Sequence, residues 1–230
     1  MPEVAPEPDL IALALSVPDV AEPLARKRPK PGERRVQILE ALAAMLELPG
    51  AERVTTAALA ARLDVSEAAL YRHFASKAQM FEGLIEFIEQ TVFTLVNQIT
   101  EREADPSARV RKLVVMVLQF AEKNPGMTRL MVGDALVYEH ERLQTRMNLF
   151  FDKLEAAIKQ NLRDAALTSV AAVAAVATGG AGAVVPAGDA QVRASVVMAF
   201  VAGRLQRFAR SGFRRLPSEH LDASLTYLLE

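Results

Sequence analysis

The sequence predicts an all-α protein in which a group of short helices precedes a larger helical core. Apolar residues recur at helical spacing over long segments, without the alternating pattern that is typical of strands. Most of the 12 prolines stand at the ends of these segments or in an N-terminal tail. With 230 residues, 51% of them hydrophobic, the chain is long enough for a sizeable core in one large or two modest domains.

Residues 1–31 are expected to form a disordered tail, because seven prolines deny this segment the hydrogen bonds of a continuous helix. Residues 1–25 hold five acidic residues and no basic residue. The tail ends in a basic arm at 26–30, and Arg34 and Arg35 extend this arm into the first helix. The arm either contacts the phosphates or the minor groove of a nucleic acid, or is a solvated leader.

The first helix is expected at about 32–48, where Pro49-Gly50 ends an apolar stripe. Two short helices joined by a tight link follow within 55–77. Thr55 or Thr56 can cap the first of them, because a threonine oxygen accepts hydrogen bonds from the free N–H groups of an opening turn.

Leu63-Asp64-Val65 forms the link, and Ser66 caps the second short helix. Glu67 adds negative charge at the positive end of that helix. Ser76 and Gln79 then form a capping box for a third, long helix.

A helix, a three-residue turn and a second helix form a DNA-reading arrangement, in which the second helix enters the major groove. Residues 26–80 carry ten basic and six acidic residues, an electrostatic footprint that favours phosphate contact by the arm. We therefore interpret residues 32–78 as a DNA-binding domain. The expected DNA contacts are Arg34, Arg35, Thr55, Thr56, Ser66, Glu67, Ala68, Ala69, Tyr71, Arg72, His73 and Lys77. Within this set, phosphate contacts are expected from Thr56, Ser66, Tyr71 and Lys77, and base contacts from Ala68, Ala69 and Arg72.

The rest of the chain, 79–230, is expected to form a helical core that also dimerises. Its first helix, about 77–102, has one apolar stripe, and Phe87 and Phe93 lie about 120° to either side of it. Such an aromatic residue either touches a second neighbour in the bundle or stays exposed to bind a partner. Further helices are expected at about 105–123, 125–133, 134–164, 189–211 and 217–229.

Two stretches of the core have unusual composition. Residues 194–202 are apolar on all sides, so they must be buried on more than one face, and with the last helix they form the natural dimerisation pair. Residues 165–188 are of low complexity and are expected to be a loop, an insert or a frayed helical extension. They lack charge but are mostly small residues interrupted by Gly179-Gly180 and Pro186, which disfavours a membrane span.

Few residues suit catalysis or metal binding. The absence of cysteine excludes disulfides and thiolate chemistry and fits the reducing cytoplasm, where we expect this protein. The histidines His73, His140 and His220 stand on different elements, and no phosphate loop or nucleophile elbow is present. His140 between Glu139 and Glu141 could bind a metal, but a solvated helix face is the simpler interpretation. We expect no enzyme activity, no metal and no cofactor.

The helix-turn-helix and the cluster that closes it resemble the TetR family of helical regulators. The matching positions are Thr55, Thr56, Ser66, Ala69, Tyr71, His73, Phe74 and Lys77. Asp64 departs from the usual glycine of the turn, although aspartate tolerates left-handed backbone better than most residues. The resemblance implies a helix-turn-helix domain, a C-terminal regulatory and dimerisation domain, and a homodimer.

Further segments resemble the nucleoid occlusion branch of this family. They are 66–77, 80–89, 122–126, 142–150 and 205–213, within a likeness that covers about 33–163 and 189–230. The resemblance implies palindromic chromosomal sites, commonly bound by two dimers, and disruption of polymers of the division protein FtsZ by the DNA-bound protein. The FtsZ groove of the family maps to Phe87, Lys123 and Asn124. Lys123 replaces an arginine, which keeps the charge but loses the bidentate geometry.

Two functions therefore stay open. One is a DNA-activated inhibitor of division at the nucleoid, and the other is a ligand-responsive transcriptional repressor, the commonest role in the wider family. A repressor needs a pocket with convergent polar groups, whereas the core helices offer aliphatic faces and no tryptophan, which favours a protein partner. A DNA-binding protein without partners is a third, less favoured alternative.

Overall fold

The computed structural model describes residues 33–48, 54–176 and 187–229, and all regular structure within these ranges is helical. The expected all-α class is confirmed. The helices, including the short 3-10 helix η2, are α2 (Glu33–Leu46), α3 (Thr56–Arg62), α4 (Glu67–Tyr71), α5 (Lys77–Arg102), α6 (Pro106–Lys123), α7 (Pro125–Met131), η2 (Asp134–Leu136), α8 (Glu141–Val176), α9 (Ala187–Arg210) and α10 (Leu221–Leu229).

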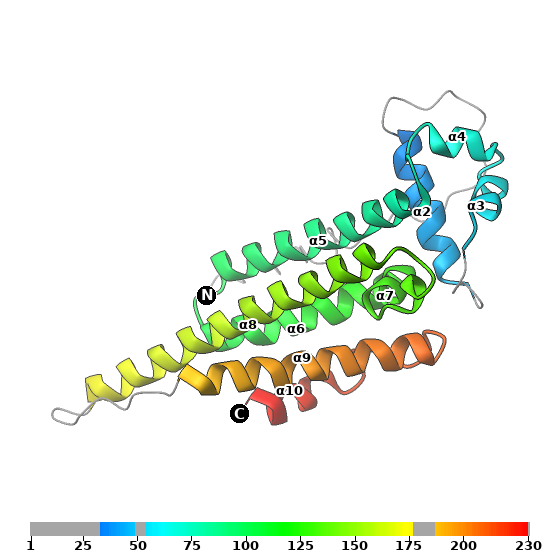
Figure 1. Cartoon of the computed structure of the whole chain (residues 1–230). Helices are drawn as coiled ribbons and strands as arrows, with labels where there is room; N and C mark the ends of the chain where they lie inside the picture. The colour runs from blue at the N-terminus through cyan, green and yellow to red at the C-terminus, as the bar shows by residue number, and fades with distance from the viewer. Residues whose placement is uncertain (1–32, 49–53, 177–186, 230) are drawn as a thin grey trace, which may run out of the picture.

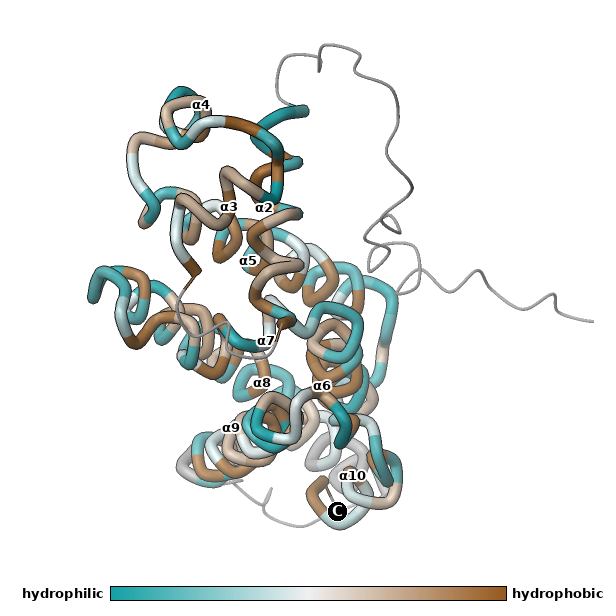
Figure 2. The backbone as a smooth tube through the Cα atoms, turned by 90° about the vertical axis from the view of Figure 1, so that its right-hand side faces the viewer, coloured by the Kyte–Doolittle hydropathy of each residue, from teal (hydrophilic) through white to brown (hydrophobic). Residues whose placement is uncertain are grey.

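The molecule is elongated, with α2, α3 and α4 gathered at one end (Figure 1). We call these three helices, within residues 33–48 and 54–71, the head. The core has three layers, with α5 on one side, α6 and α8 in the middle, and α9 and α10 on the other side (Figures 1 and 2). α7 lies at the end of the core beside α2, and α5 leads from the head along the core.

One continuous apolar cluster joins the head to the core. Leu42 of α2, Leu70 of α4 and Phe74 are fully buried in it, as are residues of α5 such as Ile85. Gly126 brings α7 close to α2, because a Cβ atom at this position would collide with the carbonyl oxygen of Ala43. The head therefore packs on the core through backbone as well as side chains.

Local hydrogen bonds start the core helices where the sequence predicts. Ser76 Oγ accepts a hydrogen bond from the N–H of Gln79 at 3.2 Å, and Gln79 Oε1 accepts one from the N–H of Ala75 at 2.8 Å. The capping box thus closes on the residue before Ser76. Asp105 caps α6 through two backbone N–H groups, and Pro106 follows as the first helical residue.

Ion pairs connect the start of α8 to α5. Arg146 donates two hydrogen bonds from Nε and Nη2 to the carboxylate of Glu89, the shorter at 2.6 Å, and this contact raises the pKa of Arg146 above its ordinary value. Arg142 donates to Glu82 at 2.7 Å one turn earlier. These pairs fix the register of the two helices along the face of α5 that turns towards α8.

Phe93 packs inside the bundle, which is the first of the two alternatives for the aromatic residues of α5. Its ring meets Phe150 of α8 edge to face with centroids 5.6 Å apart, and Phe150 meets Phe151 at 5.1 Å. Phe87 differs, because 39% of its surface is exposed.

The structure describes part of the stretch 165–188 and all of the stretch 194–202. α8 continues to Val176, so the first half of the stretch 165–188 is helical, while 177–186 lie outside the described residues. The tail 1–31, with its basic arm, also lies outside them. In α9, Val197 is buried whereas Val196 is 50% exposed, so one apolar face of this helix has no cover within the described chain.

Candidate nucleic-acid interface

Side-chain caps build the α3–turn–α4 unit. Thr55 Oγ1 accepts a hydrogen bond from the N–H of Ala58 at 3.2 Å, and Ser66 Oγ accepts one from the N–H of Ala69 at 3.3 Å. Both hydroxyl groups therefore satisfy free N–H groups of an opening turn, as their positions in the sequence predict.

The turn between α3 and α4 requires left-handed backbone at one residue. Asp64 adopts it with φ of 52°, where the resemblance to the TetR family leads one to expect glycine. Leu59, Leu70 and Phe74 are buried beneath the two helices. The unit is thus held from the inside, and its polar side chains are left on the surface.

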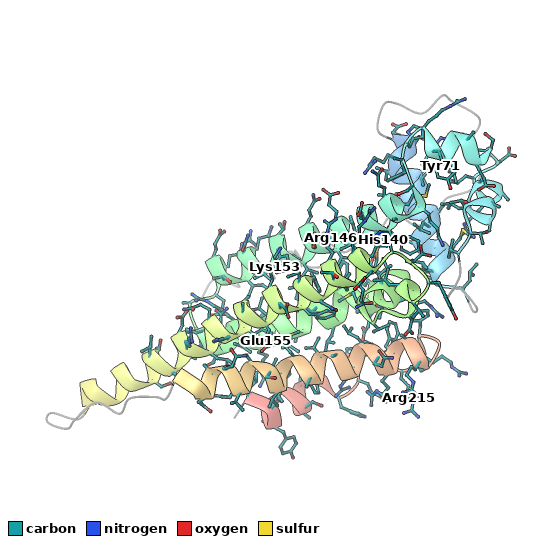
Figure 3. All side chains as sticks on the ribbon, viewed as in Figure 1. Tyr71, His140, Arg146, Lys153, Glu155 and Arg215 are labelled. Atoms are coloured by element: carbon teal, nitrogen blue, oxygen red, sulfur yellow. The ribbon has the colours of Figure 1, made fainter. Side chains whose placement is uncertain are left out.

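α4 presents small and polar side chains outwards. Ala68, Arg72 and His73 are exposed, Tyr71 is 45% exposed, and Ala69 is half-buried. Figure 3 shows Tyr71 on the head, away from the core helices. The small alanine side chains would let the α4 backbone approach a base-pair edge closely, and the tyrosine and arginine offer hydrogen bonds to phosphates and bases.

Two of the predicted contact residues bind each other. Thr56 Oγ1 donates a hydrogen bond to Glu67 Oε2 at 2.5 Å, which ties the start of α3 to the start of α4. Thr56 is half-buried and Glu67 is exposed. The bond holds the two helix starts together, and a phosphate contact by Thr56 would compete with it.

Arg35 also serves the fold of the head. Its Nη1 donates to the carbonyl oxygen of His73 at 3.0 Å, and its guanidinium carbon lies 4.1 Å from the centroid of the Phe74 ring. The side chain joins α2 to the end of α4 by a hydrogen bond and a cation–π contact. Arg34, its neighbour, is half-buried.

Lys77, at the start of α5, pairs with Glu139, a partner that no pattern in the sequence predicts. Its ammonium group forms a salt bridge with Glu139, whose side chain is only 9% exposed, and it also lies 5.5 Å from the Phe81 ring centroid. The pair joins the base of the helix-turn-helix to the segment between η2 and α8. DNA phosphates and Glu139 would therefore compete for one cation.

Lys77→Ala is expected to weaken binding to all DNA sequences alike, because a contact to the DNA backbone carries no base information. The slope of log K against log salt concentration should fall by about one, because one phosphate contact is lost. Glu139→Gln is expected to strengthen binding, because it releases the ammonium group to a phosphate. Fluorescence polarisation over a salt series measures both variants, with Lys123→Ala on the core as the control. An altered base preference in Lys77→Ala would contradict the backbone role.

The residues that the resemblance assigns to FtsZ do not share one environment. Phe87 is 39% exposed and Lys123 is exposed, so both side chains are accessible. Asn124 is only 5% exposed, and its amide donates to the carbonyl oxygen of Phe120 at 2.8 Å. Its side chain is bonded to the last turn of α6, so the expected partner contact by Asn124 would first have to break this hydrogen bond.

In the part of the chain that the structure describes, no group of three histidine or acidic side chains could hold a metal ion. His140 instead accepts a hydrogen bond from the backbone N–H of Arg142 at 3.3 Å. Within the same ranges, no helix is long and apolar enough to cross a membrane.

Two family models match the chain, one for each part of the fold. Residues 38–84 match the tetR family of bacterial regulatory proteins. Residues 104–230 match the SlmA-like model, a tetracyclin repressor-like C-terminal domain. The first match contains the helix-turn-helix and the start of α5, and the second contains the core from α6 to α10.

Known proteins resemble the chain over most of its length. It is 47% identical to the nucleoid occlusion factor SlmA of Idiomarina loihiensis, over 83% of this chain and 90% of that protein. Identity to the SlmA of an Escherichia coli strain is 44%, over 87% and 95%. The fold is shared with FadR from Bacillus halodurans, at a TM-score of 0.66 and 13% identity over 88% of this chain and 97% of that one. The chain therefore belongs to the TetR family of DNA-binding regulators and, within it, to the SlmA family of nucleoid occlusion factors.

Proposed function

We propose that this protein binds palindromic chromosomal sites as a homodimer, commonly two dimers to a site, and engages FtsZ while bound. It then antagonises FtsZ polymers, so that no septum forms over the nucleoid. The observation that carries this proposal is the 47% identity to a nucleoid occlusion factor over 83% of the chain. That identity extends through the core as well as the helix-turn-helix, so it supports a shared output and not only shared DNA binding.

Phe87 supports a protein partner on α5. It is 39% exposed, whereas Phe81, Ile85 and Ile88 of the same helix are at most 1% exposed. Aromatic side chains are frequent anchors of protein interfaces, because they bury a large apolar area with few rotatable bonds. Lys123 adds an exposed positive charge at the end of α6. Asn124 is left out of the proposed contact, since it is buried.

The filled core supports a protein partner over a small ligand. FadR from Bacillus subtilis, solved in complex with stearoyl-CoA, shares this fold at a TM-score of 0.62 and 11% identity. In this chain Phe120, Met147 and Phe150 of α6 and α8 are fully buried in the core. A hollow of about 240 Å³ near Ser107 and Leu162 is smaller than the ~300–1,000 Å³ of typical ligand pockets, and the larger hollow of about 750 Å³ lies outside α6 and α8, at the end of α9.

The uncovered face of α9 supports the dimer. Val192 is 62% exposed and Val196 is 50% exposed, and Ala199, Ala202 and Gly203 continue this face along the helix. A Cβ atom on Gly203 would meet nothing within 4 Å, so a second helix could approach its backbone closely. A second copy of the chain would cover this apolar stripe and offset its exposure to water.

Sedimentation of FtsZ polymers tests the proposal. The pelleted fraction of FtsZ should fall when the protein and a DNA site selected by its own binding are both present. It should change little with the protein alone or with a scrambled DNA of equal length. Light scattering of the protein should give about twice the chain mass of 25.0 kDa. Full recovery of polymer in the presence of protein and selected DNA would favour the repressor alternative.

A further inference from the structure

An arginine-rich hollow lies where α9 ends and α10 begins. Its volume is about 750 Å³, and its walls come from the end of α9, the loop 211–220 and α10. Figure 3 shows Arg215 at this end of α9, well separated from Tyr71 of the head. The residues that line it include Arg204, Arg207, Arg214, Arg215, Leu216 and His220.

Ser211 builds the turn that presents two of the arginines. Its Oγ accepts hydrogen bonds from the backbone N–H groups of Arg214 at 3.1 Å and Arg215 at 2.9 Å, and it donates to the carbonyl oxygen of Phe208 at 2.8 Å. Phe213 adopts φ of 63°, a left-handed backbone that is unfavourable for a phenylalanine. The chain maintains this conformation and thereby turns both arginines back over the end of α9.

Arg204 holds the opposite wall. Its guanidinium donates to the carbonyl oxygen of Glu219 at 2.5 Å and to Ser224 Oγ at 2.7 Å. Burial, and then repulsion from the neighbouring Arg207, lower the pKa of Arg204 below its ordinary value. Arg204 therefore organises the loop, and Arg207 remains available to a ligand.

The positive charge of the hollow is only partly neutralised from within. Four arginines line it against one carboxylate, that of Glu219. Glu219 Oε2 lies 3.7 Å from Arg207 Nη2, and both side chains are about half exposed, so this pair is weak and easily displaced.

The shape and the choice of residue indicate the class of ligand. Guanidinium groups bind phosphate oxygens in a bidentate manner, which lysines do not. A half-open concave surface of this volume suits a small ligand better than a convex duplex. We propose that the hollow binds a nucleotide carrying two or more phosphate groups. Arg207, Arg214 and Arg215 contact the phosphates, and Leu216, which is 49% exposed, packs against the base.

Isothermal titration of the full chain with ATP, ADP and AMP tests this site. ATP and ADP are expected to bind more tightly than AMP, and the double variant Arg214→Ser, Arg215→Ser is expected to lose at least tenfold in affinity. Arg210→Ser is the matched control, because Arg210 is exposed near the end of α9 but does not line the hollow. Glu219→Gln is expected to bind ATP severalfold more tightly, which a misfolded variant would not do.

Three results would overturn the proposal. The first is no binding of ATP or ADP by the unmodified chain, and the second is an equal loss in the Arg210→Ser control. The third is that the double variant weakens binding to DNA or to phosphatidylglycerol vesicles while ATP does not bind at all. The arginines would then serve a macromolecule, and the hollow would not be a nucleotide site.

Discussion

Gly126→Ala is expected to lower the free energy of unfolding by about 3 kcal/mol, because overpacking against rigid backbone lies at the costly end of its range. The new Cβ atom would collide with the carbonyl oxygen of Ala43 in α2, and a backbone oxygen cannot rotate away as a side chain can. α2 must therefore shift from α7. The gain in helix propensity from alanine, about 1 kcal/mol, does not offset this. Urea denaturation followed by circular dichroism measures the loss.

Gly83→Ala is the matched control, because this glycine of α5 also faces α2. Its Cβ atom would lie 3.0 Å from Leu39 Cδ2, the end of a flexible side chain that can adjust. A loss below about 1 kcal/mol is expected there. Equal losses in the two variants would show that contact with the Ala43 backbone is not what makes position 126 sensitive.

Phe87→Ala is expected to weaken FtsZ antagonism about thirtyfold, which corresponds to the loss of about 2 kcal/mol at an interface hot spot. The side chain is 39% exposed and stands on the core part of α5, so binding to DNA should stay unchanged. Sedimentation of FtsZ over a range of protein concentrations, always with the selected DNA site, measures the shift. Full inhibition by the variant would remove this residue from the proposed docking site and leave the proposed function standing.

Phe150→Ala is the control that distinguishes the loss of a docking contact at Phe87 from a general loss of stability. Phe150 is fully buried and touches both Phe93 and Phe151, so truncation should cost about 3–5 kcal/mol of stability. Phe87→Ala should cost less than about 1 kcal/mol, since it removes a partly exposed ring. Thermal melts of both variants should therefore differ clearly, and only Phe87→Ala should combine normal stability with lost antagonism.

The caps of α3, α4, α5 and α6 could be predicted because they depend on neighbours within one turn, whereas the helix expected at 134–164 begins only at Glu141 and continues to Val176. Thr55, Ser66, Ser76 and Asp105 each accept a hydrogen bond from an N–H group two or three residues ahead, as their residue types and positions suggest. The left-handed turn at Asp64 was less evident, because aspartate is compatible with several backbone conformations. Helical periodicity was strong enough to predict the all-α class.

Contacts of the candidate site between residues far apart in the sequence could not be predicted from local sequence patterns. Lys77 and Glu139 are separated by 62 residues, and no periodicity relates them, so their pairing needs the packed core. Arg35 was expected at phosphate, but its bond to the His73 carbonyl depends on how α2 packs beside the segment that follows α4. Asn124 was expected at a partner because of its place in a motif. Its burial follows from the tight junction of α6 and α7, where Asn124 is the single residue between the two helices.

α5 carries both Lys77 in its first turn and Phe87 ten residues later, on one continuous helix of 26 residues. At 1.5 Å per residue, the two positions are about 15 Å apart along the helix axis. A continuous helix holds these two residues at a fixed distance and offers no obvious way to change shape between them. We therefore expect chromosomal DNA to act by bringing many bound copies, each with its Phe87 site, close together. Inhibition of FtsZ polymers should then grow with the local density of bound copies, as avidity predicts.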